Sequence, residues 1–184
     1  MQFVLASGSP RRKELLSQLS IEYVVDPADI KEVVTSNIPA EVVMELSRQK
    51  AVAVSNKHQG EIVLAADTVV AVDESILGKP ADEADAFDML KKLSGRSHFV
   101  YTGVTIISAS GEINTFYEAT EVEMFENTDD QIRSYIATGE PLDKAGSYGI
   151  QGKGAILVKG IKGDYNNVVG LPLAKVARIL NEMD

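Results

Sequence analysis

The chain has 184 residues, of which 45% are hydrophobic and 24% charged, a composition typical of a globular protein with one domain. It contains no cysteine, which excludes disulfides, zinc–thiolate sites and thiol catalysis and is consistent with a reducing cytoplasm. The net charge of −9 argues against a nucleic-acid or anionic-membrane surface, and no apolar run reaches the ~20 residues that span a bilayer. We therefore expect a cytoplasmic protein without nucleic-acid or membrane partners.

The first two expected elements are a strand and a helix. Residues 2–6 are mostly apolar and predict a short buried strand. Ser7-Gly8-Ser9-Pro10 then ends the strand and starts a helix, because Ser9 is a favoured N-cap residue and Pro10 fits the first helical position. Residues 21–25 predict a second strand, which Asp26-Pro27 closes.

A long helix and a central strand follow. The apolar pattern predicts a helix from Pro39 to about Asn56. Residues 62–72 are rich in β-branched side chains and almost all apolar, which is typical of a central strand covered on both faces. Residues 84–93 predict another helix, ended by Ser94-Gly95.

The remaining elements indicate the fold class. Residues 100–108 and 113–125 flank a turn signal at residues 109–112 and predict a hairpin. Residues 128–138 predict a short helix stopped by Gly139, residues 146–163 are rich in glycine, and residues 171–183 predict a closing helix. Strands and helices mix without strict alternation, so we predict an α/β fold around a mixed sheet.

A basic segment, Arg11-Arg12-Lys13, falls in the first turn of the first predicted helix. The helix dipole is positive there, so cations are disfavoured unless an anion shares the turn. Such an anion would bind the backbone N–H groups together with the guanidinium groups. The alternative is a solvated basic helix start with Glu14 as the ion-pair partner.

Asp67 interrupts the apolar run 62–72. A carboxylate in a strand buried on both faces is costly without a partner or a metal. Strand alternation places Asp67 on the face of Ala65 and Val69, and Thr68 on the opposite face. The alternative is an Asp near the strand end that accepts hydrogen bonds from local backbone N–H groups.

The segment from Gly139 to Gly152 is rich in glycine. It is not a P-loop, because no Gly-Lys-Ser/Thr ends it, and it contains no dinucleotide-binding fingerprint. Taken alone it predicts a tight turn between strands. His58 and His98, the two histidines of the chain, belong to no metal-ligand pattern and are expected at the surface or in turns.

Together these segments resemble the Maf family. The matching blocks are, in chain order, Ala6 to Arg12 with Glu14-Leu15-Leu16, Asp29 to Glu32, Lys50-Ala51, Ala65 to Val70, Gly78-Lys79-Pro80, Tyr101 to Val104, Glu140 to Gly152 and Asn167 to Pro172. Each block is short, but their order and spacing make the resemblance specific. One departure is Lys31, where the family often has Asp.

The resemblance implies one domain over residues 1–184, with a mixed twisted sheet in two lobes, a central cleft and a fold similar to that of inosine triphosphate pyrophosphatases. It implies hydrolysis of a nucleoside triphosphate to the monophosphate and pyrophosphate, often by a homodimer. The signature of Ser-Pro-Arg-Arg, Asp-Thr and Gln is similar to that of members acting on dTTP and UTP. Modified pyrimidine nucleotides are an alternative substrate.

The family roles carry over by position. Asp67 matches the proton acceptor for water. The positions linked to base choice are Arg12, Thr68 and Gln151, and those lining the triphosphate site are Ser7, Arg11, Glu32, Lys50 and Lys79.

The residue chemistry agrees with these roles. Glu32 and Asp67 supply hard oxygen ligands, so we expect a divalent metal cofactor, Mg²⁺ or Mn²⁺. Gln151 offers a donor and an acceptor that fit the ring edge of uracil or thymine. An alternative function is a nucleotide-binding regulator of cell division without significant turnover, and another is a phosphatase that releases orthophosphate.

Overall fold

The structure is a computed structural model that describes residues 2–183. Its strands are β1 (Phe3–Leu5), β2 (Tyr23–Val25), β3 (Ile62–Val72), β4 (Ser75–Leu77), β5 (Ser97–Ile107), β6 (Ile113–Met124) and β7 (Val158–Lys162). Its α-helices are α1 (Pro10–Ser17), α2 (Pro39–Ser55), α3 (Glu83–Leu93), α4 (Asp129–Ile136), α5 (Tyr165–Val169) and α6 (Leu173–Met183). Short 3₁₀-helices are η1 (Glu140–Asp143), η2 (Ala145–Ser147) and η3 (Gly152–Leu157).

The strands form one mixed sheet in the order β2-β1-β3-β5-β6-β7, with β4 paired to β3. β1 runs parallel to both β2 and β3, so that Val4 lies between Val24 and Val63. The pairs β3–β4 and β6–β7 are antiparallel. The predicted α/β fold with a mixed sheet is therefore confirmed, as is the inner position of residues 62–72.

The chain divides into two compact units. Unit 1 comprises residues 1–68, 102–118 and 170–184, and unit 2 comprises residues 69–101 and 119–169. The long strands β3, β5 and β6 each contribute residues to both units.

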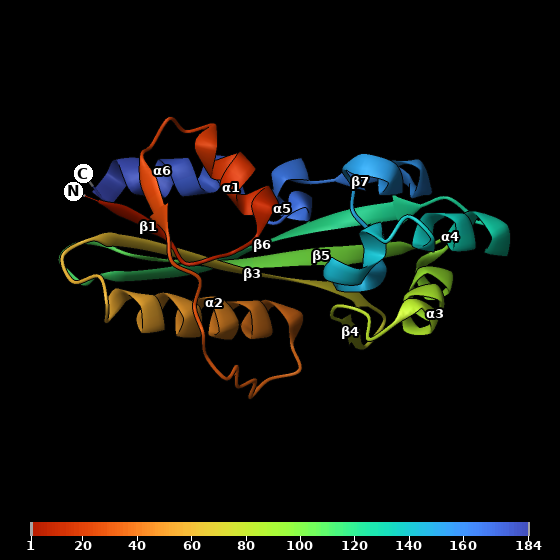
Figure 1. Cartoon of the computed structure of the whole chain (residues 1–184), viewed down its shortest axis with the longest axis horizontal. Coiled ribbons are helices and arrows are strands. Elements are labelled where there is room, and N and C mark those ends of the chain that lie inside the picture. Colours follow the sequence, from red (N-terminus) through yellow and green to blue (C-terminus); the bar gives the residue numbers. More distant parts are fainter. Residues whose placement is uncertain (1, 184) are drawn as a thin grey trace. The chain divides into compact units, whose positions relative to one another are not determined.

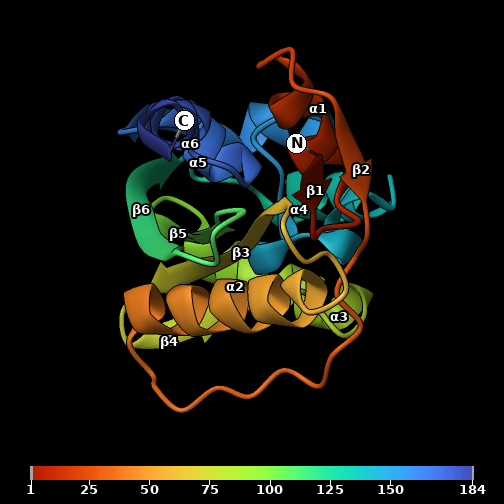
Figure 2. The ribbon, with the colours of Figure 1, turned by 90° about the vertical axis from the view of Figure 1, so that its left-hand side faces the viewer.

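In unit 1, α2 covers one face of the strands, while α1 and α6 lie on the other (Figures 1 and 2). A core of small and β-branched side chains joins α2 to β1 and β3, with Val54 and Val63 fully buried. Gly103 permits close packing of β5 on α2, because a Cβ at this position would collide with the Val43 carbonyl. The first helix starts at Pro10 as predicted, but Ser9 makes no capping hydrogen bond through its side chain.

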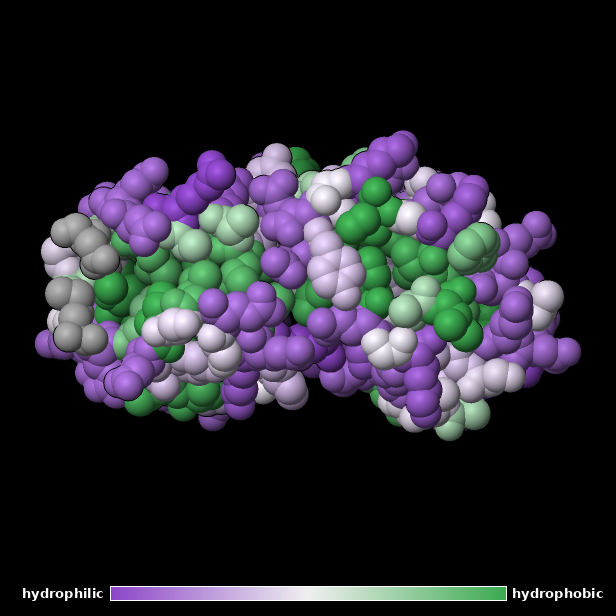
Figure 3. Space-filling model, turned by 90° about the horizontal axis from the view of Figure 1, so that it is seen from above, coloured by the Kyte–Doolittle hydropathy of each residue, from purple (hydrophilic) through white to green (hydrophobic). Residues whose placement is uncertain are grey.

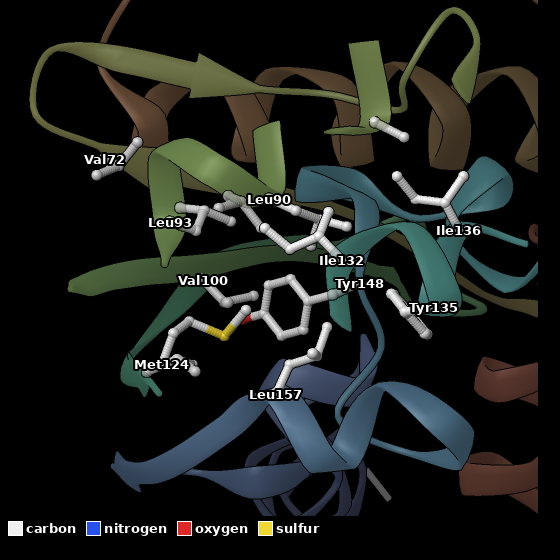
Figure 4. Packing of buried hydrophobic residues seen from close by; sticks show 13 residues of the cluster. Val72, Leu90, Leu93, Val100, Met124, Ile132, Tyr135, Ile136, Tyr148 and Leu157 are labelled. Atoms are coloured by element: carbon white, nitrogen blue, oxygen red, sulfur yellow. The ribbon is translucent and has the colours of Figure 1, made fainter. Parts of the chain in front are cut away.

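Unit 2 has a core of its own, shown in Figure 4 around the ring of Tyr148. Val100, Met124 and Leu157 pack there with side chains from α3 and α4. His98 is only 2% exposed and contacts Tyr148 edge-on, so the expectation of a surface or turn position for this histidine was wrong. It was wrong because His98 lies at an inward position of β5, where alternation directs it into the core.

The helices begin and end close to their predicted bounds, and local signals explain why. Thr128 forms a capping box with Gln131 at the start of α4, and the Asp82 side chain caps α3. The short strands β4 and β7, the three 3₁₀-helices and α5 were not predicted.

No helix within residues 2–183 is long and apolar enough to cross a membrane. In Figure 3, hydrophobic side chains gather on the left-hand part of the surface, between rims of hydrophilic side chains. Contiguous exposed apolar surface of this kind is typical of a contact site for another molecule.

Candidate functional site

Three predicted site residues meet in unit 1. The Lys50 ammonium lies 2.5 Å from Asp67 Oδ1 and 2.9 Å from Glu32 Oε1. Lys50 and Asp67 are largely buried, with side chains 17% and 15% exposed, whereas the Glu32 side chain is 47% exposed. Two carboxylates of different segments thus converge on one cation at the rim of the unit 1 core.

The position of Asp67 on β3 explains how a charge is tolerated there. Residues 63–66 and 69–72 are buried, but Asp67 and Thr68 between them are only partly so. Asp67 contacts Lys50 of α2, and Thr68 contacts Arg12 of α1, so the two side chains lie on opposite faces as alternation predicted. The hydrogen bond of Asp67 comes from a lysine side chain rather than from the local backbone N–H groups of the alternative interpretation.

Glu32 is held in place through the segment that follows it. The Gln49 amide makes two hydrogen bonds to Val33, donating to its carbonyl at 2.6 Å and accepting from its N–H at 3.0 Å. One turn earlier on α2, Glu45 accepts hydrogen bonds from the N–H and hydroxyl of Thr35. We call residues 33–36 the strap. Because Gln49 precedes Lys50 in α2, the strap directs Glu32 to the lysine that also binds Asp67.

Arg12 uses three nitrogen atoms of its guanidinium group within unit 1. Nε donates to the Gly170 carbonyl at 2.8 Å, one terminal nitrogen donates to Thr68 Oγ1 at 2.9 Å, and the other to Ser7 Oγ at 3.3 Å. Burial lowers the pKa of Arg12, and Arg11 adds to this effect while Asp67 opposes it. The structure thus brings together Ser7, Arg12 and Thr68.

Two further residues of this cluster were missed from the sequence. Thr102 lies 2.9 Å from Thr68, hydroxyl to hydroxyl, and Gly170 supplies the carbonyl that binds Arg12. Both stand in blocks that match the family, but a threonine and a backbone carbonyl carry no signal of their own. Gly170 is 158 residues away from Arg12, so only the fold reveals the contact.

Of the three remaining predicted residues, Arg11 lies half-buried on α1 in unit 1, and the other two belong to unit 2. Lys79 is exposed in the loop between β4 and α3. The Gly146 N–H donates to the Gly78 carbonyl at 3.0 Å, which ties this loop to the glycine-rich segment. Gln151 lies in that segment, half-buried, immediately before η3.

The chemistry of the unit 1 cluster suits a polyphosphate and a water molecule. The cations Arg11, Arg12 and Lys50 supply positive charge in a chain whose net charge is −9. Asp67 and Glu32 supply carboxylate oxygens, one largely buried and one half-exposed, which can accept protons or bind a hard cation.

Comparison with known proteins extends over nearly the whole chain. Residues 2–183 match the family model described as Maf-like protein. A Bacillus cytotoxicus protein named dTTP/UTP pyrophosphatase is 54% identical over 184 residues, covering 100% of this chain and 96% of the relative. An Agathobacter rectalis protein of the same name is 52% identical over 200 residues, covering 99% and 97%.

The fold is also found among solved structures. The nucleoside-triphosphatase / dITP/XTP pyrophosphatase from Mycobacterium abscessus superposes with a TM-score of 0.51 at 15% identity, covering 100% of this chain and 98% of that one. At this identity the likeness concerns the fold alone, which agrees with the predicted relation to inosine triphosphate pyrophosphatases.

Proposed function

Because this chain belongs to the Maf family, we propose that it is a nucleoside triphosphate pyrophosphatase that hydrolyses dTTP and UTP to the monophosphate and pyrophosphate. The full-length similarity to two proteins named dTTP/UTP pyrophosphatase supports the substrate. Among the features of the structure, the convergence of Asp67 and Glu32 on Lys50 carries the proposal furthest. Two carboxylates and one ammonium meet there, which supports the assignment of a proton acceptor, a metal ligand and an anion-binding cation to this cluster.

Asp67 is the proton acceptor in the proposed reaction. It takes a proton from a water molecule whose oxygen attacks the α-phosphorus, while the bond from that phosphorus to the bridging oxygen breaks and pyrophosphate leaves. Lys50 pairs with Asp67 and Glu32, and the phosphates of the substrate offer it a further anionic partner. Arg11 and Lys79 neutralise charge on the remaining phosphate oxygens, and Ser7 lines the same site.

A divalent cation fits the donor set of this site. No group of three or more His, Asp or Glu side chains within residues 2–183 is arranged to hold a metal alone. Mg²⁺ and Mn²⁺ are usually held by one or two carboxylates together with substrate phosphates and waters, and Glu32 and Asp67 already converge on one cation. When bound there, the metal would polarise phosphate oxygens and neutralise their charge.

Base choice is assigned to three residues. Arg12 donates hydrogen bonds to Thr68 and to the Gly170 carbonyl, and the Thr68 hydroxyl also lies 2.9 Å from that of Thr102, so both side chains are held in place within unit 1. Gln151 supplies the amide that pairs with the carbonyl and N–H of a uracil or thymine ring.

The first experiment distinguishes this function from its alternatives. The purified protein is incubated with dTTP or UTP and Mg²⁺, and pyrophosphate and orthophosphate are measured separately over time. We expect pyrophosphate as the first product, and loss of activity when the metal is chelated. Orthophosphate as first product would indicate a phosphatase, binding without turnover would indicate a nucleotide-binding regulator of cell division, and activity unchanged by chelation would contradict the metal.

We further propose a cytoplasmic homodimer without nucleic-acid or membrane partners, in one domain of two lobes. The exposed apolar surface in Figure 3 supports self-association. Sedimentation analysis at several concentrations tests this, and a monomer throughout would contradict it.

A further inference from the structure

Gln151 lies in the middle of a loop, residues 149–154, whose two ends touch. The Gly149 carbonyl lies so close to Gly154 that a Cβ on Gly154 would collide with it. Gln151 itself has an extended backbone, with φ −90° and ψ 167°, and does not cap η3 with its side chain. Its side-chain amide has no hydrogen bond to another residue in the described part of the chain, so it remains available to a ligand.

Two side chains hold the base of this loop. The Tyr135 hydroxyl accepts the Gly149 N–H at 3.2 Å and donates to Glu140 Oε1 at 3.1 Å. The Glu140 carboxylate in turn accepts the N–H groups of Lys153 at 3.0 Å and Gly154 at 3.2 Å. Three backbone N–H groups, from residues on both sides of Gln151, therefore donate hydrogen bonds to Tyr135 and Glu140. We call these two residues the clamp.

The clamp is anchored to the unit 2 core. The Tyr135 ring is 3% exposed and packs in the cluster of Figure 4 beside Ile132 and Ile136. Burial raises the pKa of Tyr135, so its hydroxyl keeps its proton and donates. Burial also disfavours the charge of Glu140, but hydrogen bonds from Lys153, Gly154 and Tyr135 outweigh it and lower the pKa of Glu140, which stays an acceptor.

We propose that Tyr135 and Glu140 are positioning residues for base selection, which hold residues 149–154 so that the Gln151 amide meets the ring edge of the nucleotide. The inference rests on the proposed function, in which Gln151 reads the base. A loop that is fixed before binding loses less entropy when the nucleotide arrives, so its hydrogen bonds discriminate more strongly between bases.

The test compares UTP with CTP in the variants Tyr135→Phe and Glu140→Gln. CTP has the same ribose, triphosphate and ring size, but an amino group replaces a carbonyl and N3 carries no proton. We expect KM for UTP to rise about three- to tenfold, with smaller changes in kcat and in KM for CTP, because the loss amounts to a hydrogen bond to the base. The preference for UTP over CTP therefore falls.

Two controls separate positioning from a loss of stability. Ile132→Val removes a methyl group from the same helix and core but leaves every hydrogen bond of the clamp in place, so it should lower the melting temperature and leave the UTP preference unchanged. Gln151→Ala removes the amide, and adding Tyr135→Phe to it should cause no further loss of preference, since residues that act through one another are not additive.

The outcomes are distinct. A normal UTP preference in Tyr135→Phe and Glu140→Gln, with a reduced preference in Gln151→Ala, would overturn the clamp and leave the proposed function standing. The same fall in preference with Ile132→Val would mean a purely structural role and also overturn it. A wild-type protein that releases no pyrophosphate would overturn the proposed function, and the inference with it.

Discussion

At the residue scale, Asp67 offers the sharpest test of the site. Asp67→Asn keeps the shape of the side chain and an acceptor for Lys50, but removes the charge and the proton-accepting oxygen. General-base residues contribute typically ~10²–10⁴-fold to rate, so turnover should fall by at least about 10²-fold. Binding of UTP should persist, because Lys50 and the arginines remain and one negative charge near the phosphates is lost. Turnover, nucleotide affinity and melting temperature are measured on the same preparation.

Asp73→Asn is the matched control. Asp73 also pairs with a cation, Arg96, at 2.6 Å, but its side chain is 56% exposed in a turn of unit 2. An exposed pair contributes little to stability, so this variant should match wild type in all three measurements. Near-normal turnover per folded molecule in Asp67→Asn would show that Asp67 has only a structural role and that the proposed site is wrong.

The sequence indicated some site residues and not others for a physical reason. Asp67 could be recognised from the sequence because a carboxylate is unfavourable among the apolar residues of a buried strand. Tyr135, Thr102 and Gln49 carry no such conflict, since each suits its own helix or strand. Their contacts depend on how distant segments pack, and no local pattern encodes that packing.

At the element scale, the strap links α2 to the proposed metal ligand Glu32. Gln49→Glu replaces the donor to the Val33 carbonyl with an oxygen atom, so that hydrogen bond is lost and a repulsive contact takes its place. Glu32 should then be held less firmly at Lys50. A net hydrogen bond is worth about 0.5–1.5 kcal/mol, so we expect the half-saturating Mg²⁺ concentration to rise about two- to tenfold, with kcat at saturating metal nearly unchanged.

Gln59→Glu makes the same change of charge in an exposed residue of unit 1 outside the strap. Metal titrations of pyrophosphate release for the two variants and wild type give the comparison. An equal rise of the half-saturating Mg²⁺ concentration in both variants would mean that net charge causes the effect. No rise in either variant would show that the strap does not contribute to metal binding.

Elements with strong local signals were predicted within a few residues. β3 follows from its β-branched run, and the end of α4 from Gly139, while the capping box at Thr128 was seen only in the structure. β4 has three residues and β7 has the half-polar sequence Val-Lys-Gly-Ile-Lys, so neither shows the alternation that predicts a strand. Both are strands because neighbouring strands supply their hydrogen bonds.

At the scale of the whole molecule, the two histidines make the free energy of unfolding depend on pH in opposite directions. His98 belongs to unit 2, and burial lowers its pKa from 6.5 to about 4. His58 belongs to unit 1, where a hydrogen bond to Asp26, supported by Glu61 and opposed by burial, raises its pKa. The contribution of His58 is therefore complete below pH 6.5 and is lost as the pH rises through its folded-state pKa.

His98 has the opposite effect on the pH dependence of stability. The unfolded chain binds a proton at His98 that the folded chain excludes between about pH 6.5 and pH 4, so folding loses stability as the pH falls through this window. At about pH 5 the loss relative to about pH 7.5 is about 2 kcal/mol, or several degrees in the melting temperature. His98→Gln cannot titrate, so it should melt with a weaker dependence on pH across this range. His58→Gln should steepen the same dependence, because it removes the stabilisation that is present at acidic pH. Parallel melting curves of both variants and wild type at several pH values between these limits check the two signs. An unchanged slope in His98→Gln would show that the buried pair of His98 and Tyr148 does not exclude the proton.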